Sequence, residues 1–246
     1  MRLLSLSSIL ILLAYYNGGS PFVNGADSEL YPPGLLPLIN KANILLSTGQ
    51  FNEAAKVYSE AIGKKNLDSL STNSLIIFLS FFWWCGWYFI DHSPNDYLLY
   101  YKRATAYFSL QRHGSAQDDF DKVLSLTSNT FDNAHLMKAR IYTRDGHFAS
   151  ARASLALYIK AKGKKMDKEA EELDVEITEG EMLKEKADKE RKAQLWNACI
   201  ETASEALRVA SHSVEIRSWR AECALAAGDV GSSVGDLTCV VSFFKK

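Results

Sequence analysis

The chain has 246 residues, and its 28 lysines and arginines nearly balance its 29 aspartates and glutamates. A chain of this length buries a sizeable core, and a formal net charge of −1 excludes binding to nucleic acid through a broadly basic surface. With only 14 glycines and 5 prolines, the sequence favours long helical segments.

The N-terminus has the three parts of a secretory signal peptide. Arg2 precedes an apolar run over residues 3–13, and small residues follow that run. We expect a signal peptide over residues 1–26, cut after Gly25 or Ala26, and no membrane attachment once it is removed. The run is too short for a spanning helix, and a buried first helix or a signal anchor is the alternative.

Small residues recur in pairs along the rest of the chain, with a turn between the two members of each pair. The turns are clearest at Gly49, Gly146 and Gly228, each followed two positions later by an aromatic or branched residue. Antiparallel helices approach closely only where both carry small side chains, and glycine lets the chain reverse between them. The pairs are Ala42 and Ala54, Ala104 and Ala116, Ala139 and Ala151, Ala187 and Cys199, and Ala221 and Ser233.

This pattern is that of the tetratricopeptide repeat (TPR), a helical hairpin with a period of about 34 residues. We therefore predict an all-α superhelical solenoid of about five hairpins, in which each repeat buries its apolar face against its neighbours. Repeats one to three form a first sub-bundle over residues 35–165, and repeats four and five form a truncated second one over residues 166–246.

Residues 63–90 interrupt repeat one and end in an aromatic run. When they are removed, Ile62 joins Asp91, and Pro94 falls where these repeats favour a proline that ends the second helix. Three interpretations compete: a short membrane span, an exposed functional loop, and a retained intron translated in frame. The restored period favours the retained intron.

Lysine and glutamate dominate residues 160–192, where Leu173, Ile177 and Leu183 recur at roughly helical spacing. We predict a long solvated helix that joins the two sub-bundles and is supported by alternating charges. An interaction tail is the alternative.

Chemistry-bearing motifs are few. Cys199 and Cys223 take small-residue positions in predicted helices, so we interpret both as structural thiols; a disulfide in an oxidising compartment is the alternative. The five histidines have no metal-ligand spacing, and the sequence has no phosphate loop, nucleophile elbow or paired-carboxylate motif. We predict no enzymatic activity, no catalytic residue, no metal and no cofactor.

Three segments resemble a known family: Asn40 to Ala54, Asp96 to Tyr107, and Arg217 to Cys223. The family is the endoplasmic-reticulum (ER) co-chaperones that join TPRs to a C-terminal J domain, of the DnaJ subfamily C member three type. The resemblance covers roughly residues 35–238 without the 63–90 segment.

The resemblance implies an ER-lumenal module that holds unfolded or misfolded client proteins for the ER Hsp70. The J domain's His-Pro-Asp tripeptide is absent, so contact with the Hsp70 is expected to be indirect, and the chain is expected to be a truncated or naturally short form. A non-enzymatic scaffold that assembles other proteins and a membrane-anchored adaptor are the alternatives.

In such solenoids the first helix of each repeat lines the concave face. Among the positions that clamp carboxylates in cytosolic relatives, only Asn43 matches, so we predict an apolar groove that suits exposed hydrophobic client segments. Packing of these side chains between helices is the alternative. The predicted groove residues are Leu36, Ile39, Asn43, Leu46, Leu98, Tyr101, Thr105, Phe108, Leu136 and Arg140.

Overall fold

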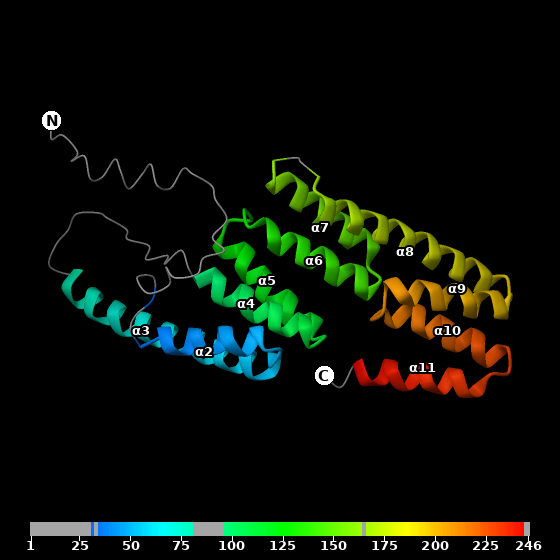
Figure 1. The fold of residues 1–246 in the computed structure, drawn as a ribbon, viewed down its shortest axis with the longest axis horizontal. Helices are drawn as coiled ribbons and strands as arrows, with labels where there is room; N and C mark the ends of the chain where they lie inside the picture. Colours follow the sequence, from blue (N-terminus) through cyan, green and yellow to red (C-terminus); the bar gives the residue numbers. More distant parts are fainter. Residues whose placement is uncertain (1–30, 32–33, 81–95, 164–165, 244–246) are drawn as a thin grey trace.

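The structure is a computed structural model that describes residues 31, 34–80, 96–163 and 166–243. These residues form ten helices and no strand (Figure 1). The helices are α2 (Leu36–Ser47), α3 (Phe51–Ser80), α4 (Asp96–Ser109), α5 (His113–Leu126), α6 (Asp132–Asp145), α7 (Phe148–Ala161), α8 (Lys168–Lys192), α9 (Trp196–Val209), α10 (Val214–Ala226) and α11 (Val230–Phe243).

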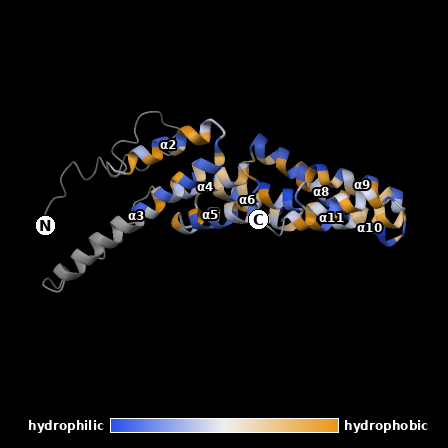
Figure 2. Ribbon diagram, turned by 90° about the horizontal axis from the view of Figure 1, so that it is seen from below, coloured by the Kyte–Doolittle hydropathy of each residue, from blue (hydrophilic) through white to orange (hydrophobic). Residues whose placement is uncertain are grey.

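The helices pair as five consecutive hairpins. Helix α2 packs on α3, α4 on α5, α6 on α7, α8 on α9, and α10 on α11. The second helix of each of the first four hairpins also packs on the first helix of the next, which stacks the hairpins into one array (Figure 1). Hydrophobic and hydrophilic residues alternate along the helices, as expected where each buries part of its surface (Figure 2). The predicted all-α TPR solenoid is confirmed.

The predicted small-residue pairs lie in the core. Eight of the ten side chains are fully inaccessible to solvent, and Ala221 and Ser233 are each 2% exposed. Because a larger side chain at any of these positions would push the two helices apart, the sequence period follows directly from helix packing.

The turns within the hairpins use left-handed backbone. Gly49, Gly146 and Gly228 have φ of 77°, 77° and 90°, as the sequence pattern predicts. In the other two hairpins Gln111 and Gln194 adopt φ of 58° and 60°, so the same turn forms there without glycine.

A buried ion pair recurs in the second and fifth hairpins. Arg103 of α4 donates two hydrogen bonds of 2.7 Å to Asp119 of α5 and a third to Ser59 of the preceding helix α3. Arg220 of α10 makes the same set of bonds, to Asp236 of α11 and Ser204 of α9. Each arginine thereby joins its own hairpin to the one before it.

Helix α3 begins as the second helix of repeat one and continues past Ile62 to Ser80, through the first part of the 63–90 segment. The rest of that segment lies outside the described residues, as do Pro94 and the predicted signal peptide over residues 1–26. Among the helices that the structure describes, none is both long and apolar enough to cross a membrane.

The charged segment forms a long helix, as predicted, but that helix is not a solvated linker. Helix α7 ends at Ala161, and α8 begins at Lys168, where the Asp167 carboxylate accepts a hydrogen bond from the Ala170 amide. The buried side of α8 packs on α7 and α9, and Gly180 lies so close to α7 that a Cβ there would stand 2.4 Å from the Phe148 ring. The charges therefore occupy only the outer sides of a packed helix.

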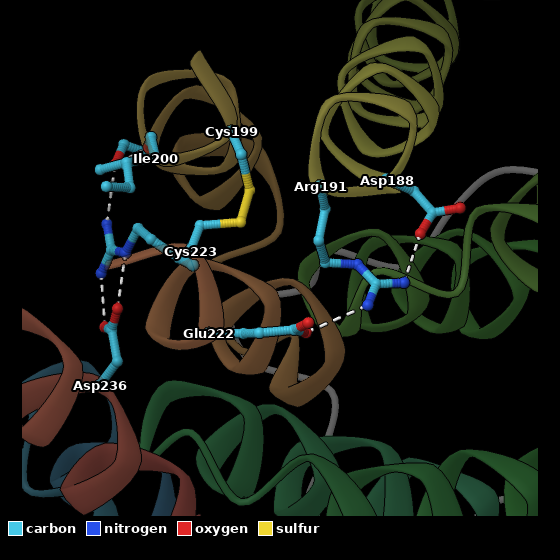
Figure 3. The surroundings of a disulfide bond; sticks show 9 residues. Asp188, Arg191, Cys199, Ile200, Glu222, Cys223 and Asp236 are labelled. Atoms are coloured by element: carbon cyan, nitrogen blue, oxygen red, sulfur yellow. Dashed lines mark hydrogen bonds and ion pairs between the residues drawn. A yellow bond between two sulfur atoms is a disulfide. The ribbon is translucent and has the colours of Figure 1, made fainter. Parts of the chain in front are cut away.

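The interpretation of Cys199 and Cys223 as thiols is wrong, because the two residues form a disulfide (Figure 3). Both are fully buried, and their Cα atoms are 6.3 Å apart. The small-residue positions of α9 and α10 face each other between hairpins four and five, so the close packing that selects small side chains also brings the sulfurs together. The bond joins the last two hairpins covalently.

We predict that Ala104→Leu lowers the free energy of unfolding by about 1–3 kcal/mol, because it overpacks the fully buried contact of α4 with α5. Thermal unfolding followed by circular dichroism measures the effect. Ala153→Leu, at an exposed position of α7, is the matched control and should change the melting temperature little. Equal melting temperatures for parent and Ala104→Leu would contradict the helix packing described.

We predict that Cys199→Ala with Cys223→Ala lowers the free energy of unfolding by about 3 kcal/mol, because it opens a loop closed by residues 24 positions apart. A reductant should lower the melting temperature of the parent and leave that of the double variant unchanged. The exposed Cys239 provides the control, since Cys239→Ala should retain the parent's response. A parent whose melting temperature is insensitive to a strong reductant would refute this assignment.

Candidate functional site

The predicted groove residues lie on the first helices of the first three hairpins, but they differ in burial. Ile39 and Leu136 are 1% and 3% exposed and belong to the hydrophobic core, where they pack between helices as the alternative interpretation held. The other eight are partly exposed. Only these eight are positioned to contact a ligand without rearrangement of the core.

Asn43 is engaged in the fold. Its side-chain oxygen accepts hydrogen bonds from the Tyr58 hydroxyl at 2.8 Å and from the Lys102 ammonium at 3.0 Å. Asn43 thus ties α2 to α3 and α4, and this oxygen is occupied by two donors from the protein.

Tyr101 lies in an aromatic cluster that joins the second hairpin to the third. Its ring centroid is 5.8 Å from that of Phe120 and 5.1 Å from that of Phe131, both in edge-to-face geometry. Burial raises the pKa of Tyr101. With the partly exposed Leu98 one turn earlier on α4, it gives this part of the groove an apolar wall.

A groove of about 760 Å³ opens further along the array, where α4, α6, α8 and α9 meet. It includes two of the predicted residues, Phe108 and Arg140, and the remainder come mainly from α8 and α9. Its lining residues are Phe108, Arg140, Thr143, Arg144, Glu169, Glu172, Leu173, Glu176, Glu179, Arg208, Val209 and Ser211.

Charge distinguishes this groove from the predicted apolar surface. Glutamates line it from α8 and arginines from α6 and α9, with Phe108, Leu173 and Val209 between them. Arg140 pairs with Glu169 across the groove, and the Arg144 guanidinium lies 4.7 Å from the centroid of the Phe108 ring. The surface can therefore contact apolar and charged groups of one ligand together.

Sequence reasoning missed the α8 contribution because it assigned the segment to a linker. The available signal is the spacing of Glu169, Glu172, Glu176 and Glu179, which recur every three or four residues and so share one face of a helix. That face turns toward the groove together with Leu173, which is 5% exposed, while Ile177 turns into the core.

Two histidines from distant parts of the sequence are in contact. His113 begins α5 of the second hairpin, and His212 lies in the connection between α9 and α10. The ring centroids of His113 and His212 are 4.4 Å apart, and His113 Nδ1 lies 2.5 Å from the Asp145 carboxylate. The His212 amide donates to the Arg144 carbonyl oxygen at 2.9 Å. This group, His113, Asp145 and His212, is called the histidine joint below.

Burial is the main reason why the pKa of His212 is lowered to about 4. The neighbouring His113 ring and the positive charges of Arg144 and Arg217 lower this pKa further, whereas the Asp145 carboxylate raises it. The His212 ring is therefore neutral in the folded protein at neutral pH. Among the described residues, the histidine joint and the other clusters of His, Cys, Asp and Glu form no group that could hold a metal ion.

Comparisons with known proteins agree with this architecture. The tetratricopeptide repeat family matches residues 37–63 and 97–130. The crystal structure of the P58(IPK) TPR domain superposes with a TM-score of 0.61 and 21% identity, covering 85% of this chain and 50% of that chain, which shows a shared fold.

Two curated relatives are similar in sequence. The tetratricopeptide repeat and J domain-containing co-chaperone DNJ1 of Cryptococcus neoformans is 34% identical over 210 residues, which are 85% of this chain and 34% of the relative. DnaJ homolog subfamily C member 3 of Rattus norvegicus is 27% identical over 149 residues, which are 60% of this chain and 29% of the relative. The chain thus spans about a third of the length of these relatives.

We predict that stability decreases as the pH falls from about 6.5 toward 4, because the unfolded chain protonates His212 throughout a range in which the folded protein does not. His212→Gln should remove this contribution, on the order of 1–2 kcal/mol for a ring that stays partly exposed to solvent screening. Unfolding by urea across this pH range measures it. His147→Gln removes an exposed imidazole and should keep the parent's dependence of stability on pH. If the free energy of unfolding changes with pH equally in the parent, His212→Gln and His147→Gln, the prediction is contradicted.

Proposed function

Because this chain is a TPR protein homologous to J-domain co-chaperones, we propose that it is a client-binding co-chaperone module. It holds unfolded or misfolded proteins in its groove within the ER lumen, for transfer to the Hsp70 of that compartment. The proposal includes no catalytic step.

The observation that carries the proposal is the homology to the fungal DNJ1 co-chaperone over 85% of the chain. The alignment covers 85% of this chain, most of which is the repeat array, and a repeat array can bind other polypeptides along its concave surface. Client binding is therefore the part of a co-chaperone's activity that we assign here, with contact to the Hsp70 made through other components.

The disulfide supports a lumenal location. Disulfides form and persist in oxidising compartments and are rare in the reducing cytosol. A bond between fully buried cysteines that joins two hairpins is structural in character. The predicted signal peptide over residues 1–26 supports the same compartment by an independent route.

The described surface supports binding of extended segments with apolar side chains. Leu36 and Leu98 are partly exposed on the first helices of the first two hairpins, and the charged groove opens further along the array. Unfolded chains present apolar side chains that a folded partner would bury, so an apolar wall followed by a mixed surface suits them.

A second candidate function is that of a scaffold which assembles folded proteins. The charged lining of the α6–α8–α9 groove favours it, because fixed charges discriminate between partners more sharply than apolar contacts do. A scaffold binds a folded partner of complementary charge and leaves an unfolded client in solution, so the two candidates predict opposite outcomes in one assay.

We predict that Leu36→Gln with Leu98→Gln weakens client binding at least tenfold, since each polar side chain replaces an apolar contact worth about 1–3 kcal/mol. Binding is measured by fluorescence anisotropy with lysozyme that has been reduced and alkylated beforehand, so that no reductant reaches Cys199 and Cys223. Ile44→Gln is the matched control, because Ile44 is 62% exposed on α2 and lies outside the predicted groove residues.

Binding by the parent and by Ile44→Gln, with loss in the double variant and unchanged helicity, is the expected result. A parent that binds no unfolded lysozyme would refute client binding and favour the scaffold. Binding that survives in the double variant would leave client binding in place and show that the groove assignment is wrong.

A further inference from the structure

The α6–α8–α9 groove has walls of opposite charge. All four of its glutamates come from α8, and its three arginines come from α6 and α9. Phe108, Leu173 and Val209 supply the apolar part of the lining. With a volume of about 760 Å³, the groove has room for several side chains of an extended segment. The charge that such a segment must carry depends on which of these groups the fold already pairs.

The arginines of this groove are mostly engaged by the protein itself. Arg140 pairs with Glu169 across the groove. Arg208 pairs at 3.7 Å with Glu205, which lies outside the groove lining. The Arg144 guanidinium lies 4.7 Å from the centroid of an aromatic ring in the lining, where cation–π attraction holds it. An acidic segment would therefore find only one of the three arginines without a carboxylate partner.

The glutamates of the α8 wall are less fully paired. Glu172 lies 3.6 Å from Lys168, in an exposed pair that solvent screens. Within the described part of the chain, Glu176 and Glu179 have no ion-pair partner, and both are exposed. The α8 wall thus presents negative charge that the fold does not pair, so charge complementarity selects a cationic occupant.

The spacing of this row matches an extended polypeptide. Glu172 and Glu176 are one turn apart, about 6 Å along the axis of α8. Alternate residues of an extended segment are about 6.6 Å apart and point to the same side, while the residues between them point to the other side. A segment that lies along α8 can therefore direct every second side chain to the glutamates and the intervening ones to the apolar part of the lining.

We propose that this groove binds extended client segments in which basic residues alternate with apolar ones. The basic side chains pair with Glu176 and Glu179, and the apolar side chains contact the rest of the lining. That the occupant belongs to a client rests on the proposed function, whereas its positive charge rests on the groove. The two parts of the concave surface then differ in role: the wall at Leu36 and Leu98 accepts apolar segments in general, and the groove discriminates by charge.

The test is fluorescence anisotropy of the full chain with labelled peptides of about seven residues, which extend over about 23 Å. One peptide alternates lysine with valine, a second alternates glutamate with valine, and a third alternates lysine with serine. The parent should bind the lysine–valine peptide at least tenfold more tightly than either of the others, because only that peptide offers both basic and apolar side chains. Raising the ionic strength to about 1 M should weaken this binding, because the Debye length falls to about 3 Å.

Variants of the α8 wall place the binding in the groove. Glu176→Gln with Glu179→Gln should weaken binding of the lysine–valine peptide at least tenfold and keep the parent's helicity, because both side chains are exposed and glutamine has the same shape. Glu171→Gln with Glu201→Gln removes the same charge from exposed positions outside the groove lining and should keep the parent's affinity. Glu176→Lys with Glu179→Lys should reverse the preference, so that the glutamate–valine peptide binds more tightly than the lysine–valine peptide.

Equal affinity of the parent for the lysine–valine and glutamate–valine peptides would overturn this proposal, as would equal losses in the Glu176 and Glu179 variant and its control. The assay with unfolded lysozyme separates it from the proposed function. A parent that binds unfolded lysozyme without preferring the basic peptide keeps the client role and refutes charge selection by the groove. A parent that prefers the basic peptide but binds no unfolded lysozyme keeps the charge selection and refutes the client role, and a parent that binds neither refutes both.

Discussion

Close approach of helices at small side chains is the constraint on which the rest of this structure depends. Where Ala104 meets the second helix of its hairpin, no atom of its side chain reaches solvent, and the same holds at eight of the ten paired positions. Each such contact fixes the distance between two helices, and the turn residue between them fixes their direction. Repetition of one hairpin geometry then determines which helices face the concave side. The shape of the groove therefore depends on the distances between helices, which buried small side chains determine.

Small residues fix the distance between helices, but they do little to fix how one helix slides along another. The buried arginine and aspartate pairs supply that restraint. Arg103 reaches Asp119 in its own hairpin and Ser59 in the preceding one, and Arg220 repeats the arrangement with Asp236 and Ser204. A buried ion pair contributes little net stability, because desolvation offsets the attraction between the charges. Its geometric demands are strict, however, since two-point hydrogen bonding fails when either helix shifts by a residue. We therefore assign these pairs to alignment of consecutive hairpins.

The sequence was sufficient for features that depend on local spacing. The five hairpins and the three glycine turns follow from small residues and turn residues a short distance apart. Contacts between residues of different hairpins were not predicted from the sequence. The Cys199–Cys223 disulfide joins two helices whose sequence pattern treats both cysteines as small side chains. The histidine joint brings together His113 and His212, which are 99 positions apart, and no local signal connects them. The inner face of α8 was missed for another reason: a high density of charge was taken as full solvation, although five of its residues are buried.

The groove and the histidine joint share a boundary, and this links the shape of the array to its chemistry. Phe108 lines the groove and stacks on His113, which contacts Asp145 and His212. Arg144 lines the groove as well, lies over the Phe108 ring, and accepts the His212 amide through its carbonyl oxygen. The same contacts therefore hold the second hairpin against the third and position the Phe108 ring in the groove. A ligand that contacts Phe108 or Arg144 therefore contacts residues that also touch the joint.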